Sequence, residues 1–183
     1  MLPYTLLRSK RKTLSMEITP EGSLLVRAPL HLPEETIRAF VEKHEAWALA
    51  RLPKARAKAE IRAQITPELE ARLRRAAERD LFPRVQHWAA VMRLCPAGVR
   101  ITGAQKRFGS CSARGNLCFS WRLMLYPAAA REYVVVHELA HLVQLNHSPR
   151  FYALVAQYLP DYKARAALLN EPPRLPEMDR LEP

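Results

Sequence analysis

The chain has 183 residues, of which 49% are hydrophobic, and a formal net charge of +11. This length suits one compact unit with a sizeable core. No stretch approaches the roughly 18 apolar residues that a membrane span needs, and residues 1–11 lack the apolar run of a secretory signal. We therefore expect a cytoplasmic protein with no membrane partner.

The positive charge lies mainly in the first half, where residues 1–100 hold 19 basic and 11 acidic side chains. Such an excess favours polyanions, so nucleic acid is a candidate partner through the basic surface, although many basic surfaces only keep a protein soluble. Cys95, Cys111 and Cys118 are odd in number and lack the spacing of a secreted disulfide scaffold. This usage is typical of a reducing compartment.

The opening of the chain predicts a small antiparallel sheet. Three short segments have strand character: residues 4–9, 12–19 and 23–28. Pro20, Glu21 and Gly22 form a turn signal between the last two segments. We therefore expect a β-hairpin region over residues 1–30.

Proline and charge patterns predict a helical region over residues 33–95. Pro33, followed by carboxylates, begins one helix, which we expect to run out near Pro53. Thr66 and Pro67 begin a second long helix. Pro83 should kink or end that second helix, because proline lacks the backbone N–H that a helix interior uses.

From residue 99 the pattern returns to short strands and then to an apolar helix. Four segments have strand character: residues 99–102, 106–109, 117–121 and 123–126. Pro127 begins a helix that we expect to reach Leu145, and its apolar residues on nearly every side predict burial. Ser148 and Asp161 can cap two later helices. The predicted fold class is α+β, with small antiparallel or mixed sheets packed on a buried helix.

These elements are expected to form a single domain over residues 1–170. Its third part, after the hairpin and helical regions, is a metal-site region over residues 99–170. Four prolines follow Glu171, which predicts a flexible tail over residues 171–183.

The apolar helix carries an HExxH motif, His137-Glu138-Leu139-Ala140-His141. Residues four apart lie on one face of a helix, so one metal ion can bridge His137 and His141. Glu138 occupies the adjoining flank, where it can contact a metal-bound water instead of the metal. This arrangement is typical of hydrolytic Zn²⁺ sites.

A catalytic zinc takes three protein ligands and leaves one position for water, so a third ligand is required. His147 lies six residues after His141, the same interval as in HExxHxxGxxH enzymes, although Gln144 stands where those enzymes have glycine. Asp161 is the competing third ligand, because zinc also accepts carboxylates. We favour His147.

The main non-catalytic alternative is a zinc that only stabilises the fold. Such sites usually close with four Cys or His ligands, and the sequence offers no evident fourth. His44 and His87 lie on predicted helix faces and are expected to be ordinary packed histidines. Another divalent metal stays an alternative to zinc.

Four stretches of the second half of the chain belong together. They are Arg107-Phe108-Gly109-Ser110-Cys111-Ser112, Ser120-Trp121-Arg122-Leu123, the segment from Tyr133 to His141, and Asn146-His147-Ser148-Pro149-Arg150-Phe151. Together they resemble the YgjP-like family of metal-dependent hydrolases. The likeness extends to Arg8-Ser9-Lys10-Arg11-Lys12-Thr13-Leu14 and Pro160-Asp161-Tyr162. Phe108, Ser120 and Tyr152 depart from the usual family residues, which are Trp, Asn and Trp.

The resemblance implies a zincin-like domain related to the SprT-like and WLM peptidases. It also implies the three histidines as zinc ligands and a catalytic Glu138. The expected reaction is hydrolysis of a peptide or protein substrate by zinc-activated water, with Glu138 as general base.

The substrate is expected to lie along the strand from Arg107 to Ser112, which includes Gly109 and Ser110, because extended peptides commonly add to a sheet edge. A bulge at Gly109 with the serines in a turn is an equally weighted explanation. Arg150, Tyr152 and Tyr158 are candidate stabilisers of the oxyanion, the first two being expected to contact substrate. The alternatives to a peptidase are a DNA-associated SprT-like protease or DNA-binding module, and a non-catalytic zinc protein.

Overall fold

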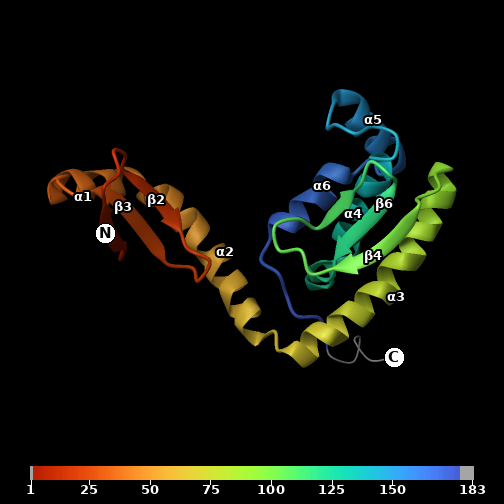
Figure 1. Cartoon of the computed structure of the whole chain (residues 1–183), viewed down its shortest axis with the longest axis horizontal. Helices are drawn as coiled ribbons and strands as arrows, with labels where there is room; N and C mark the ends of the chain where they lie inside the picture. Colours follow the sequence, from red (N-terminus) through yellow and green to blue (C-terminus); the bar gives the residue numbers. More distant parts are fainter. Residues whose placement is uncertain (1, 178–183) are drawn as a thin grey trace. The chain divides into compact units, whose positions relative to one another are not determined.

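The computed structural model describes residues 2–177, and the chain forms two compact units, Met1–Gln64 and Ile65–Pro183 (Figure 1). The described residues hold six α-helices, two 3-10 helices and two three-stranded mixed sheets. The predicted α+β fold class is therefore confirmed. The boundary at Gln64 falls inside the single domain expected over residues 1–170.

The first unit contains a sheet in the order β1-β3-β2, formed by Thr5–Ser9, Leu24–Pro29 and Ser15–Ile18. β2 and β3 are antiparallel, as predicted, but β1 runs parallel to β3, so the expectation of an all-antiparallel opening is wrong. The tight turn at Gly22 (φ +79°) places β2 on one edge of β3. β1 takes the opposite edge, where no hairpin dictates its direction.

The core of the first unit lies on one face of β3. Alternate residues of a strand point to the same side, and here that side is buried. Helices α1 (Glu34–Lys43) and α2 (Glu45–Gln64) both contribute to its cover. The buried side chains that pack there are Leu24, Val26, Ala28, Ile37, Val41, Ala48 and Leu52.

The long helices run through their prolines. α2 continues past Pro53, so the predicted helix end near Pro53 is wrong. α3 (Pro67–Met92) likewise continues past Pro83, so this proline does not end the helix. Each proline removes one helical hydrogen bond, but buried side chains such as Leu52 and Leu81 hold the flanking turns in place. The predicted start at Thr66 is confirmed, because its side chain accepts a hydrogen bond from the Leu69 N–H at 3.2 Å.

The second unit contains a sheet in the order β4-β6-β5, formed by Gly98–Thr102, Asn116–Ser120 and Gly109–Cys111. β6 is central, parallel to β4 and antiparallel to β5, which leaves β5 at an edge. Residues 123–126 were expected to form a strand, but Trp121–Leu125 is a 3-10 helix. The Ser120 side chain caps it by accepting from the Arg122 N–H, and Trp121 is fully buried.

Helix α4 (Ala128–Ala140) occupies the centre of the second unit. It contacts α3, α5 (Pro149–Tyr158), α6 (Tyr162–Ala167) and β5 (Figure 1). Its buried side chains are Ala130, Val134, Val135, Val136, Glu138, Leu139 and Ala140. The helix ends at Ala140, five residues before the expected Leu145. The backbone then turns and places His147 beside the end of the helix.

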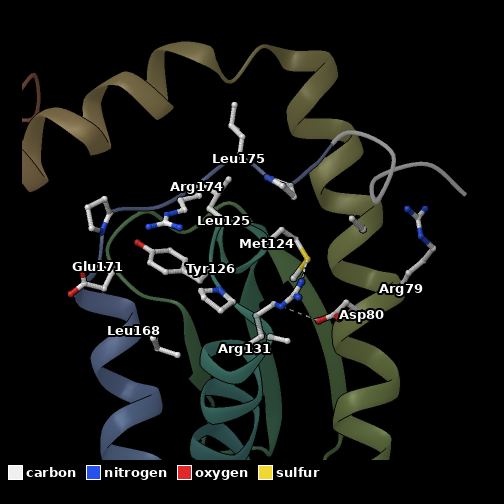
Figure 2. Close-up of a pocket in the computed structure, with 15 residues that line it drawn as sticks. Arg79, Asp80, Met124, Leu125, Tyr126, Arg131, Leu168, Glu171, Arg174 and Leu175 are labelled. Atoms are coloured by element: carbon white, nitrogen blue, oxygen red, sulfur yellow. Dashed lines mark hydrogen bonds and ion pairs between the residues drawn. The ribbon is translucent and has the colours of Figure 1, made fainter.

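The segment after Glu171 was expected to be a flexible tail. Residues 171–177 lack regular secondary structure but line a hollow of about 820 Å³ near the start of α4, and residues 178–183 lie outside the described part (Figure 2). The Arg174 N–H donates to the Leu125 carbonyl at 2.9 Å. Arg131 lies in this hollow, 3.6 Å from Asp80. None of the three predicted metal ligands lines it.

Within residues 2–177, no helix has both the length and the apolarity that a membrane crossing requires.

Candidate metal centre

The three predicted ligand histidines come together at the end of α4. His137 lies in the last turn of α4, and His141 is the residue that follows the helix. The chain then reverses so that His147 lies beside them, immediately before α5. Ser148 caps α5, because its hydroxyl accepts a hydrogen bond from the Phe151 N–H at 3.4 Å.

The geometry of the cluster fits a single metal ion. The Nε2 atom of His137 lies 3.2 Å from that of His141 and 3.0 Å from that of His147. Two nitrogens bound to one tetrahedral zinc at about 2.0–2.1 Å are separated by roughly 3.3 Å. One ligand atom from each residue lies within 4.8 Å of the others, so these residues can hold a metal ion.

Hydrogen bonds at the opposite ring nitrogens orient two of the imidazoles. His141 Nδ1 lies 3.0 Å from the Gln144 carbonyl oxygen, which can only accept, so Nδ1 carries the proton and Nε2 keeps its lone pair. His137 Nδ1 lies 3.2 Å from the Tyr133 hydroxyl. A proton on His137 Nδ1, donated to that hydroxyl oxygen, likewise leaves Nε2 free to bind metal.

Phe151 packs against all three imidazoles. Its ring centroid lies 4.8 Å from that of His137, 4.6 Å from that of His141 and 4.9 Å from that of His147. Phe151 is fully buried, so its position is fixed by the core. The cluster therefore rests on a rigid aromatic side chain.

Burial favours the neutral forms of His137 and His141. The pKa of His137 falls to about 4, mainly because burial disfavours the imidazolium and secondarily because His141 and His147 are close. Burial also lowers the pKa of His141. Neutral imidazoles have the lone pairs that a metal ion needs.

Glu138 is buried on the flank of α4 that faces β5, with 6% of its surface exposed. A Cβ atom built on Gly109 would lie 2.5 Å from Glu138 Oε1, so the carboxylate occupies the space that a side chain at residue 109 would need. Gly109 belongs to β5 and has no positive φ angle. Close approach to the carboxylate accounts for this glycine.

The pKa of Glu138 rises to about 7, because burial disfavours its charged form and Arg107 offsets this only in part. A carboxylate with a pKa near neutrality can both accept and return a proton under ordinary conditions. Perturbed carboxylates beside a ligand cluster are typical of active sites.

The other predicted site residues lie at various places around the cluster. Ser110 lies in β5 opposite Cys118, and Arg150 is exposed in the first turn of α5. The exposed Tyr152 ring lies 6.1 Å from that of His147. Asp161, the competing ligand, instead accepts a hydrogen bond from Arg165 at 2.7 Å and is outside the histidine cluster.

The contact of Tyr133 with His137 was missed in the sequence analysis. Tyr133 precedes His137 by four residues on α4, so the same helical spacing that brings His137 and His141 together could have predicted it. Also missed was the stacking of Tyr162 on Tyr133 and Tyr152, at centroid distances of 6.5 and 5.8 Å. The position of Tyr162 beside them depends on the packing of α6 on α4, which has no local signature.

A known protein family matches most of this chain. A sequence model described as "YgjP-like, metallopeptidase domain" matches residues 12–71 and 58–172. No curated protein sequence matches the chain. The crystal structure of the metallopeptidase zymogen of Pyrococcus abyssi abylysin is similar, with 18% identity and a TM-score of 0.45, covering 52% of this chain and 99% of that one.

Tyr133→Phe removes only the hydroxyl that faces His137 Nδ1. We expect zinc affinity to fall about 10-fold or more, because loss of such a partner loosens the orientation of a metal-bound histidine. Competition with a zinc chelator measures it. Tyr162→Phe, which keeps the stacked ring, is the matched control and should retain the wild-type affinity; equal affinities in all three proteins would contradict the role of Tyr133.

Glu138→Gln should stabilise the metal-depleted protein at high pH. The pKa of Glu138 is about 7 in the folded protein and 4.5 in the unfolded chain. As pH rises from about 4.5 through 7, the unfolded chain ionises more readily than the folded protein, and the folded protein loses stability. Glutamine has no such loss, and the difference reaches up to about 3 kcal/mol above pH 7 and vanishes near pH 4. Urea unfolding across pH measures it, with exposed Glu35→Gln as control; a gap that does not change with pH would contradict the buried carboxyl.

Proposed function

Because the chain belongs to the YgjP-like family of metallopeptidase domains, we propose that it is a zinc-dependent peptidase. His137, His141 and His147 hold the metal, and Glu138 is the general base. The observation that carries the proposal is the convergence of three Nε2 atoms, 3.0 and 3.2 Å apart, next to a buried carboxylate. A peptide or protein substrate follows from the family.

Three imidazoles suit zinc and leave one tetrahedral position for solvent or substrate. When bound, zinc supplies a Lewis acid that polarises the substrate carbonyl and makes water more acidic. No fourth Cys, His, Asp or Glu joins the cluster among residues 2–177. A three-residue donor set of this kind favours a catalytic site over one that only stabilises the fold.

Glu138 moves the proton in the proposed reaction. Its carboxylate accepts a proton from the attacking water and then delivers it to the nitrogen of the leaving amine. Burial supports both transfers, because a raised pKa reduces the cost of holding the proton between them. Gly109 keeps open the space that the carboxylate occupies.

The substrate backbone is proposed to lie along β5. This strand is at an edge of its sheet, so one side of it can pair with an extended peptide. β5 also contacts α4 and carries Gly109 beside Glu138. A peptide paired with Gly109 and Ser110 would thus be held next to the base, with Tyr152 and Arg150 approaching from the α5 side as substrate contacts.

Metal content and cleavage together test the proposal. The wild-type protein should hold about one zinc per chain, His147→Gln should lose most of it, and Asp161→Asn should keep it. Glu138→Gln should keep its zinc and cleave a mixed peptide library at least about 100-fold more slowly, because the general base is gone. Metal analysis and mass spectrometry of the products measure these results. Loss of zinc in Asp161→Asn, or equal cleavage with and without Glu138, would sink the proposal.

Gly109→Ala tests the close approach to Glu138. The added Cβ would collide with the carboxylate at 2.5 Å, so we expect cleavage to fall at least about 10-fold while zinc stays bound. Gly103→Ala is the matched control, because its nearest neighbour at 2.8 Å is the flexible end of Arg74, which can move aside. The explanation is wrong if both variants cleave peptides at the same rate.

A further inference from the structure

The first unit contributes no residue to the proposed metal site, yet it carries a basic stripe on α2. Arg51, Lys54, Lys58 and Arg62 recur every three or four residues, so they project from one side of the helix. All four are exposed. Glu60, the one acidic residue between Arg51 and Arg62, lies on the opposite side by the same periodicity.

A hollow of about 410 Å³ lies between this stripe and the edge strand β2. Its apolar lining is formed by Met16, Ile18, Trp47 and Ala55. The Arg51 guanidinium lies over the Trp47 indole, 5.2 Å from the ring centroid. Glu17, the acidic residue of the lining, is paired with Arg27 at 2.8 Å, which offsets its charge.

Phosphates and bases need different surfaces, and both are present here. Cations spaced by about one helical turn, roughly 6 Å, can follow the successive phosphates of an extended strand. A flat aromatic or guanidinium surface above an apolar floor suits an unstacked base. An acidic peptide would use the cations but would gain little from the indole.

We propose that the first unit binds single-stranded nucleic acid. The phosphates lie along Arg51, Lys54, Lys58 and Arg62, and a base enters the hollow against Trp47 and Arg51. A paired duplex has its bases stacked inside the helix and cannot fill the hollow, so the surface discriminates in favour of a single strand. Met1–Gln64 holds 12 basic and 7 acidic residues, which favours the same partner.

Fluorescence anisotropy of a labelled 20-residue oligothymidine, titrated with the full chain, tests the proposed phosphate contacts of the basic stripe. The logarithm of the association constant should fall with the logarithm of salt concentration, with a slope of about −2 to −3 for four neutralised phosphates. Lys54→Glu with Lys58→Glu should weaken binding at least about 10-fold. Arg38→Glu with Lys43→Glu makes the same charge change on exposed residues of α1 and should weaken binding less than about 3-fold.

Substitution of Trp47 tests the base contact. Trp47→Leu keeps every charge but should weaken oligothymidine binding about 10-fold, whereas Trp47→Phe keeps a ring and should retain most of the affinity. Neither should change the weaker binding of polyglutamate. Circular dichroism confirms that each variant is folded.

Four outcomes would overturn the proposal. They are no binding at low salt, equal loss from the α1 and α2 charge reversals, equal affinity for oligothymidine and polyglutamate, and equal affinity for single strands and duplex. Any one of them means that the stripe is a general polyanion surface or only a solvated helix face.

Discussion

The arrangement of the second unit depends on three imidazole nitrogens that face one another at 3.0 and 3.2 Å. Neutral lone pairs at this distance repel, so the arrangement is favourable only when a proton or a cation lies between them. Burial opposes the protonated form of His137, whose pKa falls to about 4. A metal ion bound between the three nitrogens, as proposed, would satisfy all of their lone pairs at once at neutral pH.

Adjacent residues on α4 have opposite preferences for a proton, and both arise from burial. Burial lowers the pKa of His137, which favours loss of its proton, and raises the pKa of Glu138 to about 7, which favours retention of its proton. Both side chains extend from a helix that is buried on most sides, where Glu138 is buried and His137 is partly buried. The energetic cost of burying both groups is what makes a functional explanation stronger than a structural one.

The two units divide the chemistry of the chain. The second unit holds the histidines, Glu138 and the edge strand β5, so everything that the proposed hydrolysis needs lies after Gln64. The first unit holds the basic stripe and the hollow beside Trp47. A peptidase joined to a nucleic-acid-binding unit would act on proteins that meet it on a nucleic acid strand.

The sequence alone determined whatever depends on neighbouring residues. The i, i+4 pair His137 and His141 follows from helical periodicity, and Thr66 and Ser148 cap helices through hydrogen bonds three residues away. The six-residue interval from His141 predicted that His147 lies near the other two histidines, and the structure places it there. The form of the turn could not be predicted, because Gln144 stands where HExxHxxGxxH enzymes have glycine.

Only the tertiary structure decided what depends on distant partners. The parallel direction of β1, the helices that continue through Pro53 and Pro83, and the contact of Gly109 with Glu138 all result from packing between segments far apart in the chain. Local propensities are worth about 1 kcal/mol per residue or less, and about 3 kcal/mol for a proline inside a helix, whereas each large apolar side chain that is buried contributes about 1.5–3 kcal/mol. Where the two disagreed, burial decided.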